Sequence, residues 1–136
     1  MSAAPDPVYV DDIRKSAKRN TWFRHVVCTG RFSQLVLMSV PPGGEIGDEV
    51  HETSDQILVI VDGEGDAIVA GRVRPIGKHD VVFVRAGTRH NIRNTGGEDL
   101  KLYTVHAPAA YAEGAIHRTR EDAIGAMVSR ASVYSR

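Results

Sequence analysis

The chain has 136 residues, of which 42% are hydrophobic and 25% are charged, the usual balance of one folded, water-soluble domain. Lysine plus arginine and aspartate plus glutamate both number 17, so the sequence lacks the net positive charge that favours nucleic acid. The single cysteine, Cys28, excludes an intrachain disulfide and fits a reducing compartment. The first residues lack the apolar core of a signal peptide, and the longest aliphatic run, residues 57–61, is too short to cross a bilayer. We therefore expect a cytoplasmic protein without a nucleic-acid or membrane partner.

Residues 1–20 are expected to form an arm and a short helix. The first ten residues contain two prolines, which favour an extended chain. Asp11 or Asp12 then supplies a side-chain oxygen that caps the free amides of a first helical turn. The helix is predicted to run to about Lys18.

Residues 21–110 are expected to form a β-barrel. Short runs of aliphatic, β-branched and aromatic residues alternate there with turns rich in glycine, proline, asparagine and aspartate. The predicted strands are residues 21–28, 32–40, 47–52, 56–61, 66–70, 72–76, 80–84, 90–94 and 100–106. About nine strands without helical crossovers indicate an all-β barrel or sandwich, because a sheet of that size must close or stack to bury its apolar face.

Residues 111–136 are expected to form a C-terminal segment with a helix. Thr119 and Asp122 have the spacing of a capping box. The apolar residues after them lie on one face of the predicted helix: Ala123, Ile124, Met127 and Val128. A helix of this kind packs across an open end of the barrel or on a neighbouring molecule.

Four polar side chains stand where metal ligands would be expected. Glu49 and His51 are two residues apart and share one face of a strand. If the next strand returns as a hairpin, Gln56 begins it beside His51. That strand is apolar on both faces, and burying an unpaired amide costs about 1 to 3 kcal/mol, so Gln56 needs a partner such as a metal ion. His90 follows a tight turn at residues 86–87 and begins another strand, which adds a fourth donor.

The spacing of these residues resembles the two motifs of the cupin superfamily. The first motif is commonly written as a His-x-His pair, a later glutamate, and a glycine seven residues after that glutamate. Gly63 lies seven residues after Gln56, and this register places Glu49 and His51 on the two histidines. Glu49 therefore replaces a histidine and Gln56 replaces the glutamate, so the formal charge of the ligand set is unchanged.

The second motif has a Pro-x-Gly turn, a histidine three residues after the glycine and an asparagine four residues further on. Gly87, His90 and Asn94 match it. Arg85 replaces the turn proline, and His79 replaces a glycine that usually precedes the aspartate at position 80.

This resemblance implies a cupin double-stranded β-helix, a jelly-roll barrel with a short N-terminal helix and a C-terminal helix. Within the superfamily the chain looks like the stand-alone, single-domain cupins labelled mannose-6-phosphate-isomerase-like. The implied cofactor is a divalent metal ion (manganese, iron, nickel or zinc) held by the residues in the motif positions, Glu49, His51, Gln56 and His90.

The implied function is metal-dependent chemistry on a small oxygen-rich substrate. An oxygenase is one expectation, and an isomerase or lyase that works through a metal-bound enolate is another; the alternative is a barrel that binds or senses a small molecule without turnover. Tyr103 or His106 would serve as a general base, and Trp22 or Gln34 would line the pocket. A homodimer is also expected, in which the N-terminal arm and the last helix cover strand edges of the partner.

Overall fold

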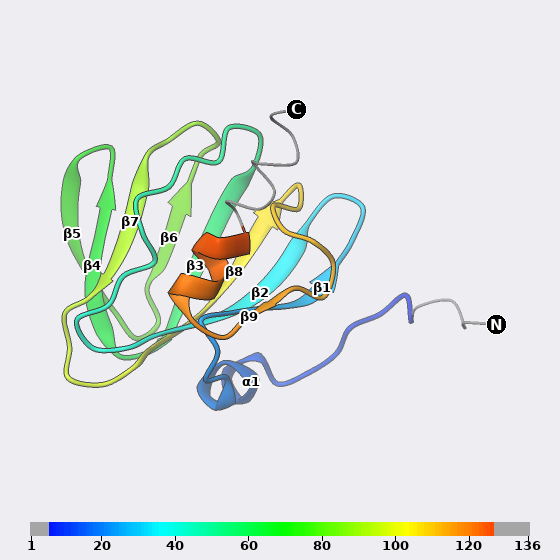
Figure 1. The fold of residues 1–136 in the computed structure, drawn as a ribbon, viewed down its shortest axis with the longest axis horizontal. Coiled ribbons are helices and arrows are strands. Elements are labelled where there is room, and N and C mark those ends of the chain that lie inside the picture. Colours follow the sequence, from blue (N-terminus) through cyan, green and yellow to red (C-terminus); the bar gives the residue numbers. More distant parts are fainter. Residues whose placement is uncertain (1–5, 127–136) are drawn as a thin grey trace.

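The computed structural model describes residues 6–126 of the chain, and it confirms the all-β prediction (Figure 1). In chain order the elements are α1 (Ile13–Arg19), β1 (Arg24–Thr29), β2 (Gln34–Val40), β3 (Asp55–Asp62), β4 (Glu64–Val69), β5 (Arg72–Gly77), β6 (Val81–Val84), β7 (His90–Asn94), β8 (Leu100–Ala107) and β9 (Ile116–His117). Residues 120–126 are also helical.

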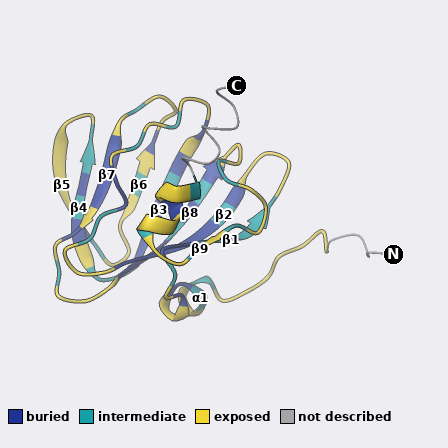
Figure 2. Cartoon of the chain, viewed as in Figure 1, coloured by how far each residue is buried: buried dark blue, intermediate teal, exposed yellow. Residues whose placement is uncertain are grey.

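The strands form two sheets that enclose the core. Six strands pair in the order β6-β3-β8-β2-β1-β9, and three pair in the order β5-β4-β7. The main cluster of buried apolar side chains takes residues from both sheets, including Val36, Leu58, Ala67 and Ile92. The buried colour in Figure 2 accordingly runs along the central strands, whereas β5 at a sheet edge is mostly exposed.

The short helix α1 covers part of the outer face of the six-stranded sheet. Asp12 caps it, as one of the two predicted caps, by accepting a hydrogen bond from the Lys15 amide at 3.1 Å. Ala17 is fully buried against Leu37 and Val61. This contact gives the outer face a second, smaller apolar cluster.

A buried lysine ties this helix to the sheet. The Lys101 ammonium on β8 donates to the carbonyl of Asn20 at 2.6 Å and to the Ser39 hydroxyl at 3.0 Å. Asn20 is the C-cap residue of α1, where an unpaired carbonyl attracts a cation.

Residues 47–52 do not form the predicted strand. The chain there runs beside β7 through two isolated bridges, Glu45 to Arg93 and Glu49 to His90, without a continuous ladder. Gly47 has a φ of 117°, and its amide donates to the side chain of Asn91 instead of a strand partner. The positive φ interrupts the extended conformation, so the ladder cannot continue through this segment.

The glycines after β3 stand at a corner between the two sheets. β3 belongs to the six-stranded sheet and β4 to the three-stranded sheet, so the chain changes sheets at Gly63. Gly63 has a φ of 88°, and a side chain at Gly65 would collide with the carbonyl of Arg93. Both positions therefore require glycine, one for its conformation and one for the close approach of two backbones.

The C-terminal helix begins as its capping residue predicts. The Thr119 hydroxyl accepts a hydrogen bond from the Asp122 amide at 3.1 Å. Ala123 is buried in the main cluster, but Ile124 is 43% exposed, so the predicted apolar face of the helix is only partly buried. Met127 and Val128 lie outside the described residues.

The strand edges leave apolar side chains exposed. Val81 and Phe83 on the edge strand β6 are 62% and 55% exposed, and Val8 and Val10 of the arm are 61% and 86% exposed. A partner molecule would cover such surfaces, and the homodimer stays a prediction. None of the helices within residues 6–126 has the length and apolar character to span a bilayer.

Candidate metal centre

The two sheets bring the four predicted ligands together from opposite sides. Glu49 lies beside His90 of the three-stranded sheet, and their backbones exchange two hydrogen bonds of 2.8 and 2.9 Å. Gln56 lies on β3 of the six-stranded sheet, where it pairs with Val84 and His106. The predicted hairpin between residues 47–52 and β3 is therefore wrong, because the donors meet across the barrel interior instead of along one ladder.

A backbone contact between the two motifs places His51. The Gly87 amide donates to the carbonyl of His51 at 2.8 Å, and Gly87 has a φ of 82°. A residue other than glycine would strain this turn. The Thr88 amide donates to the Arg85 carbonyl at 3.2 Å, so the turn forms without the proline that the motif usually carries.

The donor atoms lie at distances suited to a shared cation. One ligand atom each from Glu49, His51 and His90 lie within 4.8 Å of one another. Glu49 Oε2 is 2.9 Å from His51 Nε2, and Gln56 Oε1 is 2.9 Å from His90 Nε2. Two neighbouring ligands at right angles and about 2.1 Å from a metal would lie about 3.0 Å apart.

The hydrogen-bond pattern at His90 also fits a metal. His90 Nδ1 is 2.9 Å from the Thr88 carbonyl, and a carbonyl only accepts, so Nδ1 carries the proton. In neutral His90 the other nitrogen, Nε2, then presents a lone pair to the Gln56 oxygen, which also presents a lone pair. A cation between them would turn this repulsion into two bonds.

His106 sets the orientation of Gln56. The Gln56 amide nitrogen is 3.4 Å from His106 Nε2, so the amide oxygen faces His90. Burial, followed by the nearby His51, lowers the pKa of His106 to about 3. A neutral His106 accepts from the Gln56 amide and leaves its own Nδ1, a buried atom, without a partner among the described residues.

Arg24 enters the site from β1, and the sequence analysis missed it. Arg24 Nη2 lies 3.5 Å from Glu49 Oε1. Burial alone would raise the pKa of Glu49, but the hydrogen bond from His51 and the positive charge of Arg24 outweigh it and lower the pKa overall. Arg24 and Val26 are two residues apart on β1 and share its inward face. A charged residue at an inward position of a strand is the sequence signal that could have identified Arg24.

Tyr111 is a second residue that the sequence analysis missed. Its ring lies edge-on to His106 with the ring centres 5.1 Å apart, and Arg24 lies over the ring at 4.2 Å. Gln34 holds the loop that carries Tyr111. Its side-chain oxygen accepts hydrogen bonds from the amides of Ala110 and Tyr111, and its nitrogen donates to the Tyr111 carbonyl at 2.8 Å. Gln34 therefore positions a wall of the site.

Tyr103 does not lie with the predicted ligands. It is three residues before His106 on β8, so the two side chains point to opposite faces of the sheet. Tyr103 packs in the outer cluster with Leu37 and Val61. This position removes the expected role of Tyr103 as a general base.

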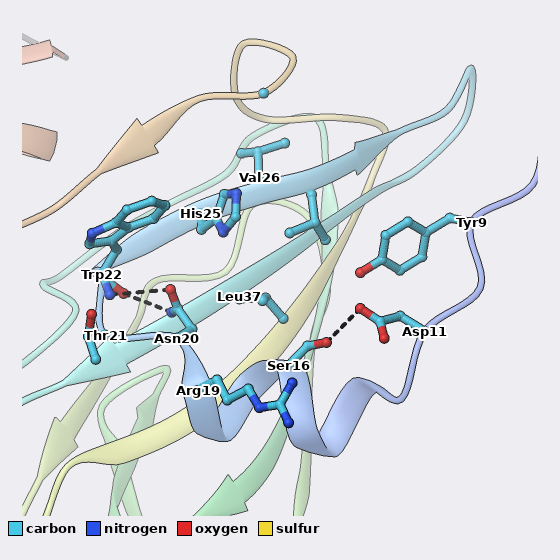
Figure 3. Close-up of a pocket in the computed structure, with 12 residues that line it drawn as sticks. Tyr9, Asp11, Ser16, Arg19, Asn20, Thr21, Trp22, His25, Val26 and Leu37 are labelled. Atoms are coloured by element: carbon cyan, nitrogen blue, oxygen red, sulfur yellow. Dashed lines mark hydrogen bonds between the residues drawn. The ribbon is translucent and has the colours of Figure 1, made fainter. Parts of the chain in front are cut away.

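Trp22 lines a different cavity from the one predicted. Figure 3 shows this cavity of about 570 Å³ on the α1 side of the six-stranded sheet, with Trp22 and His25 opposite Arg19. The Trp22 and His25 rings meet edge-on with centres 5.1 Å apart. The cavity contains none of the four predicted ligands.

The remaining motif residues are structural. The Asn94 side chain donates to the carbonyls of Val40 and Glu98 and accepts from the Gly96 amide, which orders the turn after β7. His79 has a φ of 76°, a conformation that a glycine would adopt without strain. The replacement of that glycine therefore changes the turn before β6 and leaves the candidate ligands in place.

We expect Gln56→Glu to raise the affinity for a divalent metal ion by about tenfold, because a carboxylate ligand carries a charge that an amide lacks. Gln56→Leu should lower it by a similar factor. Competition with a chromophoric chelator measures both. Glu52→Gln, at an exposed carboxylate in the same segment, is the control and should leave the affinity unchanged. Equal affinities for all three variants would remove Gln56 from the ligand set.

Comparisons with known proteins agree with this architecture. Residues 36–106 match the family described as the cupin domain. An uncharacterised protein of Bacillus subtilis, YrkC, is 37% identical over 129 residues, which are 90% of this chain and 68% of that protein. The crystal structure of BH2720 from Bacillus halodurans is similar with a TM-score of 0.85 and 35% identity, covering 89% of this chain and 96% of that one.

A second solved structure is also similar to this chain. A predicted oxalate decarboxylase from Thermotoga maritima is 36% identical with a TM-score of 0.54, covering 56% of this chain and 66% of that one. The match to the cupin domain spans more than half of the chain, and both sequence motifs lie within it. The chain belongs to the cupin superfamily, with a Glu49, His51 and His90 cluster that could bind a metal ion.

Proposed function

We propose that this protein is a metal-dependent enzyme that acts on a small, oxygen-rich substrate, as an oxygenase or as an isomerase or lyase. The observation that carries the proposal is the convergence of Glu49, His51 and His90 within 4.8 Å, with the Gln56 oxygen turned toward them. A carboxylate, an amide oxygen and two imidazoles suit manganese, iron, nickel or zinc. A bound divalent ion would supply Lewis-acid chemistry, or a site where dioxygen and substrate meet.

The protein's own residues hold and shield this centre. His90 keeps its proton on Nδ1 through the Thr88 carbonyl, and His106 holds the Gln56 oxygen toward the other donors. Tyr111 and Arg24 form a wall beside them. These contacts fix the directions of the His90 nitrogen and the Gln56 oxygen before a ligand arrives, which is the preorganisation that catalysis requires.

A second candidate function is binding or sensing without turnover. Its support is the lack of a well-placed general base among the described residues. Tyr103 faces the other side of the sheet, and His106 Nε2 is in hydrogen-bond contact with the Gln56 amide. A site that binds a ligand without moving its protons would need no such base.

The test of the first candidate begins with elemental analysis of protein purified without chelators or an oligohistidine tag. We expect about one divalent ion per chain, because residues 6–126 bring together one cluster of candidate donors. The metal-loaded protein would then be incubated with small hydroxy-ketones, enols and hydroxy-acids, with and without dioxygen, and the products followed by mass spectrometry. Metal-dependent product formation supports the enzyme, and ligands that raise the unfolding temperature but are recovered unchanged support the second candidate.

A further inference from the structure

Arg24 is a buried cation whose hydrogen-bonding groups are poorly used. The residue is 2% exposed on the inward face of β1. Its guanidinium approaches Glu49 Oε1 and His117 Nδ1, each at 3.5 Å, and its Nε has no hydrogen-bond partner among residues 6–126. Charge-assisted hydrogen bonds are usually about 2.7–2.9 Å long, and buried donors are nearly always paired. This guanidinium therefore retains donors for another oxygen-bearing group.

The residues around Arg24 pack against its guanidinium without accepting strong hydrogen bonds from it. The guanidinium carbon lies 4.2 Å from the centre of the Tyr111 ring and 5.1 Å from that of Phe23. Aromatic faces attract a cation but accept no strong hydrogen bond. A small cavity of about 140 Å³, which Arg24 and Glu49 line together with Ala123 of the C-terminal helix, adjoins the pair.

The charges at this centre would not balance once a metal binds. Without metal, the positive charge of Arg24 is matched by Glu49, which is the one carboxylate in the ligand cluster. A divalent ion adds two positive charges, whereas Gln56, His51 and His90 bind it as neutral ligands. Uncompensated charge in a buried site is costly, so the metal-loaded centre favours a ligand that brings negative charge.

We propose that the ligand of this centre is a small carboxylate that carries a neighbouring hydroxyl or oxo group, and that Arg24 binds its carboxylate. The planar guanidinium presents donors that match the two oxygens of a carboxylate. The neighbouring oxygen would then lie toward the donor cluster of Glu49, His51 and His90. This inference rests on the proposed metal function and narrows its substrate class from oxygen-rich molecules to anions.

The experiment compares glycolate with glycolamide, its neutral analogue of nearly equal size, by calorimetric titration into metal-loaded protein. We expect the wild-type protein to bind glycolate about tenfold or more tightly than glycolamide. Arg24→Met keeps an unbranched apolar stem and removes the guanidinium with its charge, so it should weaken glycolate binding by about 10- to 100-fold and leave glycolamide binding unchanged. Arg24→Lys keeps the charge and should lose less glycolate affinity than Arg24→Met.

Arg118→Met is the matched control, because Arg118 is an exposed arginine of the segment beside β9. It should bind glycolate as the wild type does. Metal content is measured for every protein before titration. A wild-type protein that takes up no metal overturns the proposed function itself. A metal-loaded wild type that does not prefer glycolate, or an Arg24→Met protein that binds glycolate with wild-type affinity, overturns the inference while the metal centre stands.

Loss of metal from Arg24→Met would also overturn the inference, since Arg24 would then serve only to hold Glu49. If Arg24→Met does not fold, the preference of the wild type for glycolate and the partial retention in Arg24→Lys still decide the question.

Discussion

Replacing His90 by alanine is expected to lower the affinity for a divalent metal ion by about 100-fold or more, since loss of a ligand costs at least as much as loss of a residue that supports one. His51→Ala should have a similar effect. Both residues offer a nitrogen to the same cluster, and His90 Nε2 lies 2.9 Å from the Gln56 oxygen. Metal content after dialysis, together with competition against a chelator, measures the loss.

His25→Ala is the matched control for these two variants. His25 is a half-buried histidine that lines the cavity on the α1 side of the sheet, outside the cluster. It should keep the wild-type metal content. Far-ultraviolet circular dichroism and the unfolding temperature of the metal-free proteins show whether each variant is folded at the temperature of the assay. Full metal occupancy in folded His51→Ala and His90→Ala proteins would falsify the assignment of the site.

Leu58→Ala is expected to destabilise the metal-free protein by about 3 to 5 kcal/mol, the range of fully buried leucines whose removal leaves a cavity. Leu58 is 0% exposed on the inward face of β3, in the main cluster. A loss of this size is a large fraction of the roughly 5 to 15 kcal/mol that stabilises a typical domain. Urea unfolding followed by tryptophan fluorescence and circular dichroism should therefore show a much lower midpoint.

Val59→Ala provides the comparison within the same strand. Val59 is the next residue and half-buried on the outer face, so its truncation should cost about 1 kcal/mol. The slope of the unfolding free energy against urea should be unchanged in both variants. Equal losses of stability for the two variants would contradict the assignment of the inner and outer faces of β3.

The local features of the chain were predictable from the sequence. Alternating side chains, turn residues and a capping aspartate act over a few residues, so they indicated the β-strands and α1 without knowledge of their partners. The break between the predicted strands 66–70 and 72–76 is one example. In the structure Ala70 and Gly71 adopt a positive φ there and join β4 directly to β5. Motif spacing also selected Glu49, His51, Gln56 and His90, and the structure places these four side chains together.

The partners of these elements were not predictable in the same way. The sequence suggested that Gln56 returns beside His51 in a hairpin, whereas β3 pairs with β6 and β8 and reaches the cluster from the opposite sheet. Tyr103 and His106 were both candidates for a general base. They are three residues apart on one strand, so their side chains point to opposite faces, and only packing against α1 and the outer cluster decides that Tyr103 occupies the outer face.

The sequence by itself determined the class of fold, the positions of most strands and the polar residues able to bind a metal, because each depends on short-range periodicity or spacing. Only the tertiary structure decided that Arg24 and Tyr111, far apart in the chain, lie over one another beside Glu49. Such contacts depend on which strands pair and which loop closes over them. The pairing of the strands is decided by the burial of the whole core. No short stretch of sequence contributes enough of that energy to predict the pairing by itself.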